Sequence, residues 1–185
     1  EGAVAEAVAS FLTLFSTSTD VLGNLEVEVK EGRGKHIVLE AHMDQIGFVV
    51  TAVSEDGFVK ISPVGGVDEK LMPASKIVIY GKNPVKAVVC ATPPHLLSGE
   101  EKASKFDDLW VDTGKADGIS VGDHAVFSPS FTVLSGGVVS GVGLDDKAGI
   151  AALIVCADRL KELDNDVKVT LLFTTQEEVG ERGAA

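Results

Sequence analysis

The sequence predicts an α/β domain that is interrupted by a small β-barrel-like domain. Residues 167–174 are almost wholly apolar, which is typical of a central strand covered by helices on both faces. Residues 147–163, just before this strand, place apolar side chains on one face of a helix. Residues 64–131 instead consist of short β-rich segments separated by Gly, Pro and Asp. We therefore assign residues 1–63 and 132–185 to the α/β domain, and residues 64–131 to an inserted β domain.

The N-terminal elements follow from the spacing of apolar side chains. Residues 3–15 carry a helical apolar stripe. LEVEVK (25–30) alternates apolar and charged residues and predicts an exposed strand, whereas HIVLEA (36–41) predicts a more buried one. Two further strands, 46–53 and 58–62, are joined by a short turn and predict a hairpin. This assignment places all four strands in the α/β domain.

Composition excludes several classes of partner. The chain of 185 residues has 16 basic and 28 acidic side chains, and its net charge is −12. Nucleic acids and anionic membranes bind basic surfaces, so we expect neither as a partner. The sequence contains no apolar run of the roughly 20 residues that span a membrane, and no signal peptide. We expect a cytoplasmic protein with Cys90 and Cys156 as buried reduced thiols, and a disulfide between them is the alternative.

Three clusters of acidic or histidine residues lie where strands end or a helix begins, which is the edge of an α/β sheet where sites form. They are AHMDQIG (41–47), GLDDKAG (143–149) and TTQEEVG (174–180). In the first cluster, His42 and Asp44 have the spacing His-x-Asp. This spacing fits a metal-binding imidazole with an orienting carboxylate, but it also fits a core histidine beside a turn aspartate.

The other two clusters also have two interpretations each. Asp145 and Asp146 can cap the predicted helix, and one can cap while the other points into a site. Glu177 and Glu178 repel each other if they are buried. They either lie in a solvated loop or divide two roles, one as a ligand of a divalent cation and the other as a general base. The remaining histidines lack such carboxylate spacing and are interpreted as structural: His36, His95 and His124.

Together, the three motifs resemble those of the dinuclear metallo-aminopeptidases of the glutamyl and deblocking type. These are the tetrahedral (TET) peptidases, some relatives of which are named endoglucanases. The resemblance runs through nearly the whole chain and includes SPVGG (62–66), ATPPHLL (91–97) and VGDHAVF (121–127). It implies a zinc-peptidase α/β domain that is interrupted by a β-barrel-like dimerisation domain.

The resemblance also implies roles for five residues. His42 would bind one metal, Asp145 would bridge two, and Glu178 would bind the second. Glu177 would be the general base, and Asp44 would orient the His42 side of the site. The cofactors would be two divalent metal ions per subunit, with zinc, cobalt or manganese as candidates.

The implied function is the metal-dependent hydrolysis of N-terminal residues from peptides by an activated water. The implied partners are the peptide substrate and further copies of the chain, as dimers that build a larger tetrahedral assembly. One alternative is a catalytically inactive relative or assembly module. A glycoside hydrolase is another, but it needs two carboxylates spaced across a sugar-binding cleft, whereas adjacent carboxylates with a His-x-Asp suit a metal better.

Some features depart from the pattern of the resemblance. Gln45 stands where Glu is usual and Lys147 where Arg is usual, and neither is a metal ligand. By contrast, the resemblance itself implies that the Asp145–Asp146 peptide is cis. The resemblance places a further Asp and a late His beyond residue 185, and the chain begins at Glu1 rather than Met. We therefore expect a chain that is incomplete at both ends and that alone holds no stable metal pair and is inactive.

Overall fold

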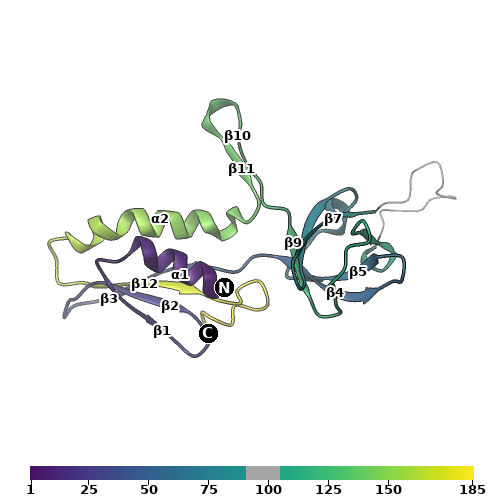
Figure 1. Cartoon of the computed structure of the whole chain (residues 1–185). Coiled ribbons are helices and arrows are strands. Elements are labelled where there is room, and N and C mark those ends of the chain that lie inside the picture. The colour runs from purple at the N-terminus through teal and green to yellow at the C-terminus, as the bar shows by residue number, and fades with distance from the viewer. Residues whose placement is uncertain (91–104) are drawn as a thin grey trace. The chain divides into compact units, whose positions relative to one another are not determined.

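The computed structural model describes residues 1–90 and 105–185. The chain forms two compact units, which we call the α/β unit (Glu1–Gln45 with Gly143–Ala185) and the barrel unit (Ile46–Val142) (Figure 1). His95 and the segment ATPPHLL lie outside the described residues. None of the helices in the described ranges is both long enough and apolar enough to cross a bilayer.

The α/β unit is built on a mixed sheet with the strand order β1-β2-β12-β3. Its described elements are α1 (Gly2–Phe11), β1 (Ser16–Thr19), β2 (Leu25–Lys30), β3 (His36–His42), α2 (Leu144–Lys161) and β12 (Lys168–Thr174). Strand β12 pairs antiparallel with β2 and parallel with β3. Because Thr174 pairs with His42, the two parallel strands end side by side.

The core of this unit lies on one face of the sheet. The inward residues of the central strands include Val27, Leu171 and Phe173, all fully buried. Helices α1 and α2 contribute Val8 and Ile150 to the same cluster. Both described helices therefore pack against a single face, which differs from the expected cover on two faces.

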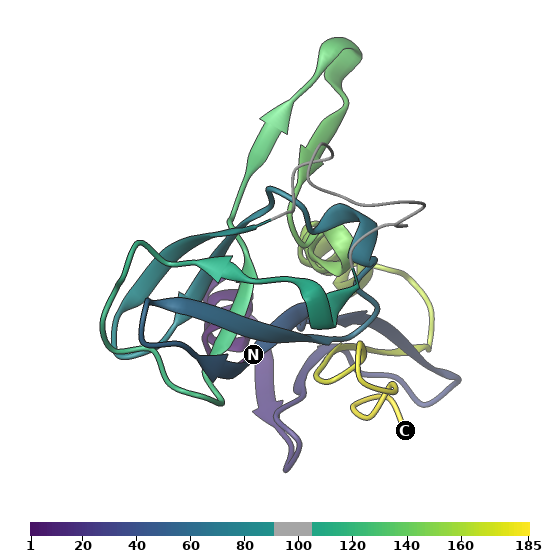
Figure 2. The same ribbon diagram turned by 90° about the vertical axis from the view of Figure 1, so that its right-hand side faces the viewer.

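The barrel unit closes six strands into a ring with the order β4-β5-β8-β7-β6-β9 (Figure 2). The strands are β4 (Gly47–Val53), β5 (Phe58–Val64), β6 (Lys76–Tyr80), β7 (Pro84–Val89), β8 (Val111–Asp112) and β9 (His124–Phe127). A separate hairpin pairs β10 (Phe131–Val133) with β11 (Val139–Gly141). Short 3-10 turns cover Glu69–Leu71, Phe106–Asp108 and Ser135–Gly137. Inside the ring, the Phe48 side chain meets Phe127 edge-on, with 5.1 Å between the ring centroids.

The limits of the β unit differ from the expected 64–131. The hairpin β4–β5, which we expected in the α/β domain, belongs to the barrel. Strand β4 pairs with β9 and β5 pairs with β8, so the ring cannot close without this hairpin. Its alternating pattern suits either a sheet or a barrel, and the pattern alone does not place the boundary.

The cysteines also differ from expectation. Both are free thiols, but Cys156 is exposed on α2 and Cys90 is only half-buried. Cys156 follows directly on a run of apolar residues, yet its helix buries the neighbouring Ala157 instead. A helix of this length turns only part of its apolar surface toward the core.

Candidate metal centre

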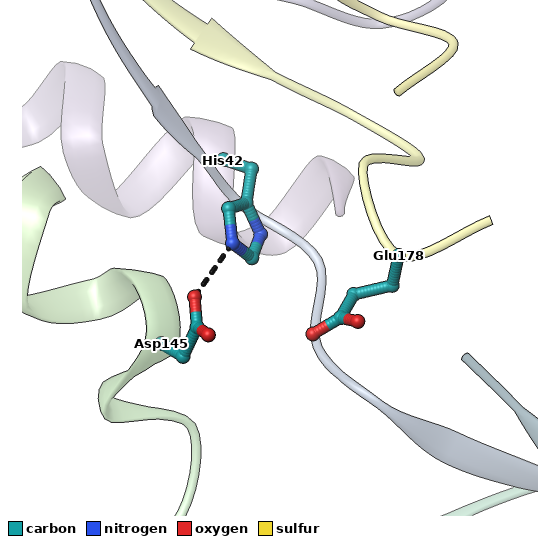
Figure 3. Close-up of side chains that lie close together, drawn as sticks. All are labelled: His42, Asp145 and Glu178. Carbon is teal, nitrogen blue, oxygen red and sulfur yellow. Dashed lines mark hydrogen bonds and ion pairs between the residues drawn. The ribbon is translucent and has the colours of Figure 1, made fainter. Parts of the chain in front are cut away.

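Three separate segments of the α/β unit bring His42, Asp145 and Glu178 together (Figure 3). His42 is the last residue of β3, Asp145 lies at the start of α2, and Glu178 lies in the loop after β12. One ligand atom from each residue lies within 4.8 Å of the other two. The imidazole Nε2 is 2.9 Å from Asp145 Oδ1. One imidazole and two carboxylates are donors that bind zinc and similar divalent ions, so the donor set fits such an ion.

The two aspartates at the start of α2 have different roles. Asp146 Oδ1 accepts a hydrogen bond from the backbone N–H of Gly149 at 3.0 Å and so caps the first turn. Asp145 has non-helical backbone angles, and its carboxylate faces His42 (Figure 3). The peptide between them is cis, as expected. Helix capping and a place in the site therefore occur together, one in each aspartate.

Asp44 makes a contact that the sequence did not reveal. Its carboxylate accepts hydrogen bonds from the backbone N–H groups of Glu177 (3.0 Å) and Glu178 (3.1 Å). The distance from Asp44 Oδ1 to His42 Nδ1 is 3.5 Å, and this buried Nδ1 has no hydrogen-bond partner. Asp44 thus lies beside His42 while it anchors the backbone that carries the two glutamates.

The carboxylate of Glu177 lies at the margin of the cluster, with Oε2 4.0 Å from His42 Nε2. The side chain of Glu177 is about a third exposed. Water can therefore reach this carboxylate while it faces the candidate ligands. This is a suitable place for a group that exchanges protons with a reacting water.

The acidic cluster perturbs the pKa values of its members. Burial lowers the pKa of His42, but the hydrogen bond that its imidazole donates to Asp145 and the negative charges of Asp44 and Glu177 outweigh this effect and raise that pKa above the ordinary value. Burial is the main cause that raises the pKa of Glu178, and the negative charge of Glu177 raises it further. The charge of His42 acts in the opposite direction but does not outweigh them. A concentration of negative charge of this kind favours a bound cation, which would offset the repulsion between the carboxylates.

Gln45 and Lys147 form a polar contact beside the site. Lys147 Nζ donates a hydrogen bond to Gln45 Oε1 at 2.7 Å. Burial lowers the pKa of Lys147, and the charge of Asp44 acts in the opposite direction. A Cβ atom at Gly143 would collide with both side-chain tips, and Gly143 itself has the left-handed φ of 70°. This glycine lets the end of β3 and the start of α2 approach closely.

Comparison with known proteins places the chain in a family. The family model for M42 glutamyl aminopeptidase matches residues 23–185. A putative aminopeptidase of Acetivibrio thermocellus is 35% identical over 171 residues, which cover 89% of this chain and 49% of the relative. The lysyl aminopeptidase of Pyrococcus furiosus is 32% identical over 176 residues, covering 89% of this chain and 50% of the relative.

A solved structure gives the same result for the fold. The TET1 peptidase of Pyrococcus horikoshii, which can assemble into a tetrahedron or a large octahedral shell, matches with a TM-score of 0.85. It is 34% identical, and the match covers 97% of this chain and 57% of that one. The chain spans about half the length of the curated relatives it matches. The match of the family model over residues 23–185, together with the shared sequence and fold, means that the chain belongs to the M42 glutamyl aminopeptidase family.

Proposed function

We propose that the whole protein is a metal-dependent aminopeptidase that hydrolyses N-terminal residues from peptides. The observation that carries this proposal is the convergence of His42, Asp145 and Glu178 within 4.8 Å, with Glu177 beside them. These residues come from three distant parts of the chain and offer ligands that suit a divalent ion. Membership of a family of aminopeptidases supports the same reaction.

In this proposal, His42 would hold one of two metal ions and Glu178 would hold the other. Asp145 would be a ligand that both ions share. Divalent ions bound there supply Lewis-acid chemistry, which lowers the pKa of a water and stabilises negative charge on a carbonyl oxygen. Zinc and cobalt both suit imidazole and carboxylate ligands, and manganese is a further candidate.

Glu177 is the general base in the proposed mechanism. Its carboxylate accepts a proton from the water that attacks the scissile carbonyl, and it returns the proton to the departing amine. Asp44 keeps this carboxylate in place by binding the backbone N–H groups of Glu177 and Glu178. The negative charges of the cluster also suit the free α-amino group of a peptide, which would confine cleavage to the first residue.

The ligand count limits what this chain does by itself. The described residues offer three ligand side chains in one cluster, whereas a pair of tetrahedral ions needs more, even with one shared carboxylate. We therefore expect the 185-residue chain alone to hold no stable pair of ions and to be inactive. Zinc bound to it at two equivalents per chain, measured by elemental analysis, would contradict this expectation.

The barrel unit is the proposed site of self-association. The TET1 peptidase of Pyrococcus horikoshii assembles into closed shells, and the present chain shares its fold over nearly the whole length. We expect dimers formed through the barrel unit to build a similar assembly. Removal of residues 47–127 from the whole protein should abolish the large species in size-exclusion chromatography with light scattering.

Glu177→Gln in the whole protein tests the proposed reaction. The amide cannot accept the proton, so the kcat for aminoacyl-anilides should fall by about 10²- to 10⁴-fold while bound metal is retained. Glu181→Gln is the matched control, because Glu181 lies in the same loop and is exposed. Unchanged turnover in the Glu177 variant would remove the proposed base. Cleavage of cellulose but not of anilides would favour a glycosidase instead.

A further inference from the structure

A buried amide of the α/β unit joins the two ends of the loop that carries the glutamates. We call residues 175–183 the glutamate loop. Asn24 lies just before β2 and is only 3% exposed. Its hydrogen-bond partners in the glutamate loop are 151 and 159 residues away in the sequence. The proposed mechanism assigns this side chain no role.

The Asn24 amide is hydrogen-bonded at both its oxygen and its nitrogen. Oδ1 accepts from the backbone N–H of Thr175 at 2.9 Å. The Thr175 hydroxyl lies 3.2 Å from Oδ1 and 3.1 Å from the backbone O of Leu22, so these two oxygens share its single proton. Nδ2 donates to the backbone O of Gly183 at 2.7 Å and to Asp20 Oδ2 at 2.8 Å. Both donor positions of the amide are therefore filled, and its oxygen has one undivided and one shared hydrogen bond. Reversing the amide would set oxygen against the Gly183 oxygen, and the network therefore fixes its orientation.

Asn24 is itself held in place by its own turn. Asp20 Oδ1 accepts hydrogen bonds from the backbone N–H groups of Leu22 (2.8 Å) and Asn24 (3.0 Å). Gly23 between them has a φ of 94°, which glycine adopts without strain. The turn thus holds the Asn24 amide in the orientation in which it binds the glutamate loop.

The glutamate loop is closed where Asn24 binds it. The backbone N–H of Gly183 donates to the O of Thr175 at 3.0 Å, which joins the two ends. A side chain at Gly183 would collide with Thr175 O and Asn24 Oδ1, so the closure needs glycine there. Glu177 and Glu178 follow Thr175 by two and three residues, and Asp44 binds their N–H groups from the other side.

We infer that Asn24 is a positioning residue for the candidate metal centre. It fixes the ends of the glutamate loop, while Asp44 fixes the backbone of the glutamates themselves. With both contacts in place, the carboxylates of Glu177 and Glu178 lie where a metal ion and a reacting water need them. This inference rests on the proposed function, because it assigns the two carboxylates those roles.

The test compares two variants of the whole protein. Asn24→Ala removes the amide and leaves Thr175 N–H and Gly183 O without their partner. Thr170→Val is the matched control, since Thr170 is buried in β12 and its hydroxyl bonds His36 rather than the glutamate loop. Three quantities are measured for each: the urea midpoint, the Zn²⁺ affinity by competition with a chelator, and kcat at saturating Zn²⁺.

Both variants should unfold at lower urea concentration than the wild type. Only Asn24→Ala should also weaken Zn²⁺ binding, by about 10- to 100-fold, and lower kcat at saturating Zn²⁺. If Asn24→Ala keeps wild-type zinc affinity and kcat while its midpoint falls like that of the control, Asn24 serves stability alone and the inference is wrong.

A second variant covers the case in which Asn24→Ala does not fold. Thr175→Val removes the hydroxyl that Asn24 Oδ1 and the backbone O of Leu22 share, and should give a smaller change in zinc affinity in the same direction. If the wild type binds Zn²⁺ but cleaves no peptide, the proposed function fails while the affinity comparison still decides the role of Asn24. If the wild type binds no Zn²⁺, amide hydrogen exchange decides it. Faster exchange of the Glu177 and Glu178 amides in Thr175→Val than in Thr170→Val supports positioning, and equal exchange overturns it.

Discussion

The α/β unit and the barrel unit bury polar side chains very differently. Among the described residues, the barrel unit buries a single polar side chain, Thr113, whose hydroxyl bonds the backbone O of Gly57. The α/β unit buries five: Asn24, His42, Thr170, Thr174 and Thr175. A buried polar group costs free energy unless it is hydrogen-bonded, and among these five side chains only His42 has a buried atom, Nδ1, without a hydrogen-bond partner.

The topology of each unit explains this difference. A closed ring pairs every strand on both sides and leaves an interior that apolar side chains fill. The open sheet of the α/β unit leaves β3 at one edge, where Ile37 and Val38 are nearly half exposed. It also aligns the ends of β3 and β12, and the polar side chains gather there. In this protein, the α/β unit carries all the candidate ligands and the barrel unit carries none of them.

The largest effects should come from matched substitutions in the two cores. Phe173→Ala and Phe48→Ala each remove a fully buried ring and should each cost about 3–5 kcal/mol in their own unit. Both described α-helices lie in the α/β unit, so circular dichroism at 222 nm follows that unit. The single tryptophan, Trp110, lies in the barrel unit and reports on it by fluorescence.

Each variant should therefore shift mainly one signal. Phe173→Ala should lower the urea midpoint by circular dichroism and leave the fluorescence midpoint in place, and Phe48→Ala should do the reverse. The milder Phe173→Leu provides a folded variant if alanine is not tolerated. If either variant shifts both midpoints by the same amount, the two units unfold together. They would then differ in structure but not in their stability.

The difference between the two units also explains which parts of the site could be predicted from the sequence. His42, Asp145 and Glu178 each stand where a strand ends or a helix begins, and such positions meet at one edge of an α/β sheet. The family resemblance implied their roles. Their convergence was therefore predictable from local pattern and residue type.

The contacts of Asn24 and Asp44 with the glutamate loop were not predictable in this way. They join residues more than 130 positions apart through backbone groups, which leave no trace in side-chain patterns. The hairpin β4–β5 shows the same limit, because an alternating strand fits an open sheet and a ring equally well. The apolar run of β12 likewise predicted two covered faces, although Thr170 and Thr174 on its other face bond His36 and Glu40.

A smaller effect is expected from pH. In the presence of EDTA, the free energy of unfolding of the α/β unit should depend on pH. The raised pKa of His42 means that the folded state binds this proton more tightly than the unfolded state. This stabilisation is complete below the ordinary pKa of about 6.5 and is lost as pH rises through the folded value. The raised pKa of Glu178 acts in the same direction, with its loss beginning above about 4.5.

The urea midpoint by circular dichroism should therefore fall between pH 6 and pH 8 without metal. His42→Asn should flatten this fall. Zinc affinity should rise over the same range, because ligand protons compete with the ion. An equal slope in the His42 variant would show that other groups cause the pH dependence.

The smallest effects should come from two matched lysines, one in each unit. Lys60 Nζ lies 4.3 Å from the centroid of the Trp110 ring, and Lys161 Nζ lies 5.4 Å from that of Phe15. Lys60→Met should lower the fluorescence midpoint by an amount that corresponds to about 0.5–1 kcal/mol. Lys161→Met should shift only the circular dichroism midpoint, and by less, because phenylalanine attracts cations more weakly than tryptophan does and the distance is longer.

Zinc affinity should be unchanged in both variants, since neither lysine contacts the candidate metal centre. A loss of zinc affinity in the Lys60 variant would mean that the barrel unit affects the candidate metal centre. The two units would then not act independently.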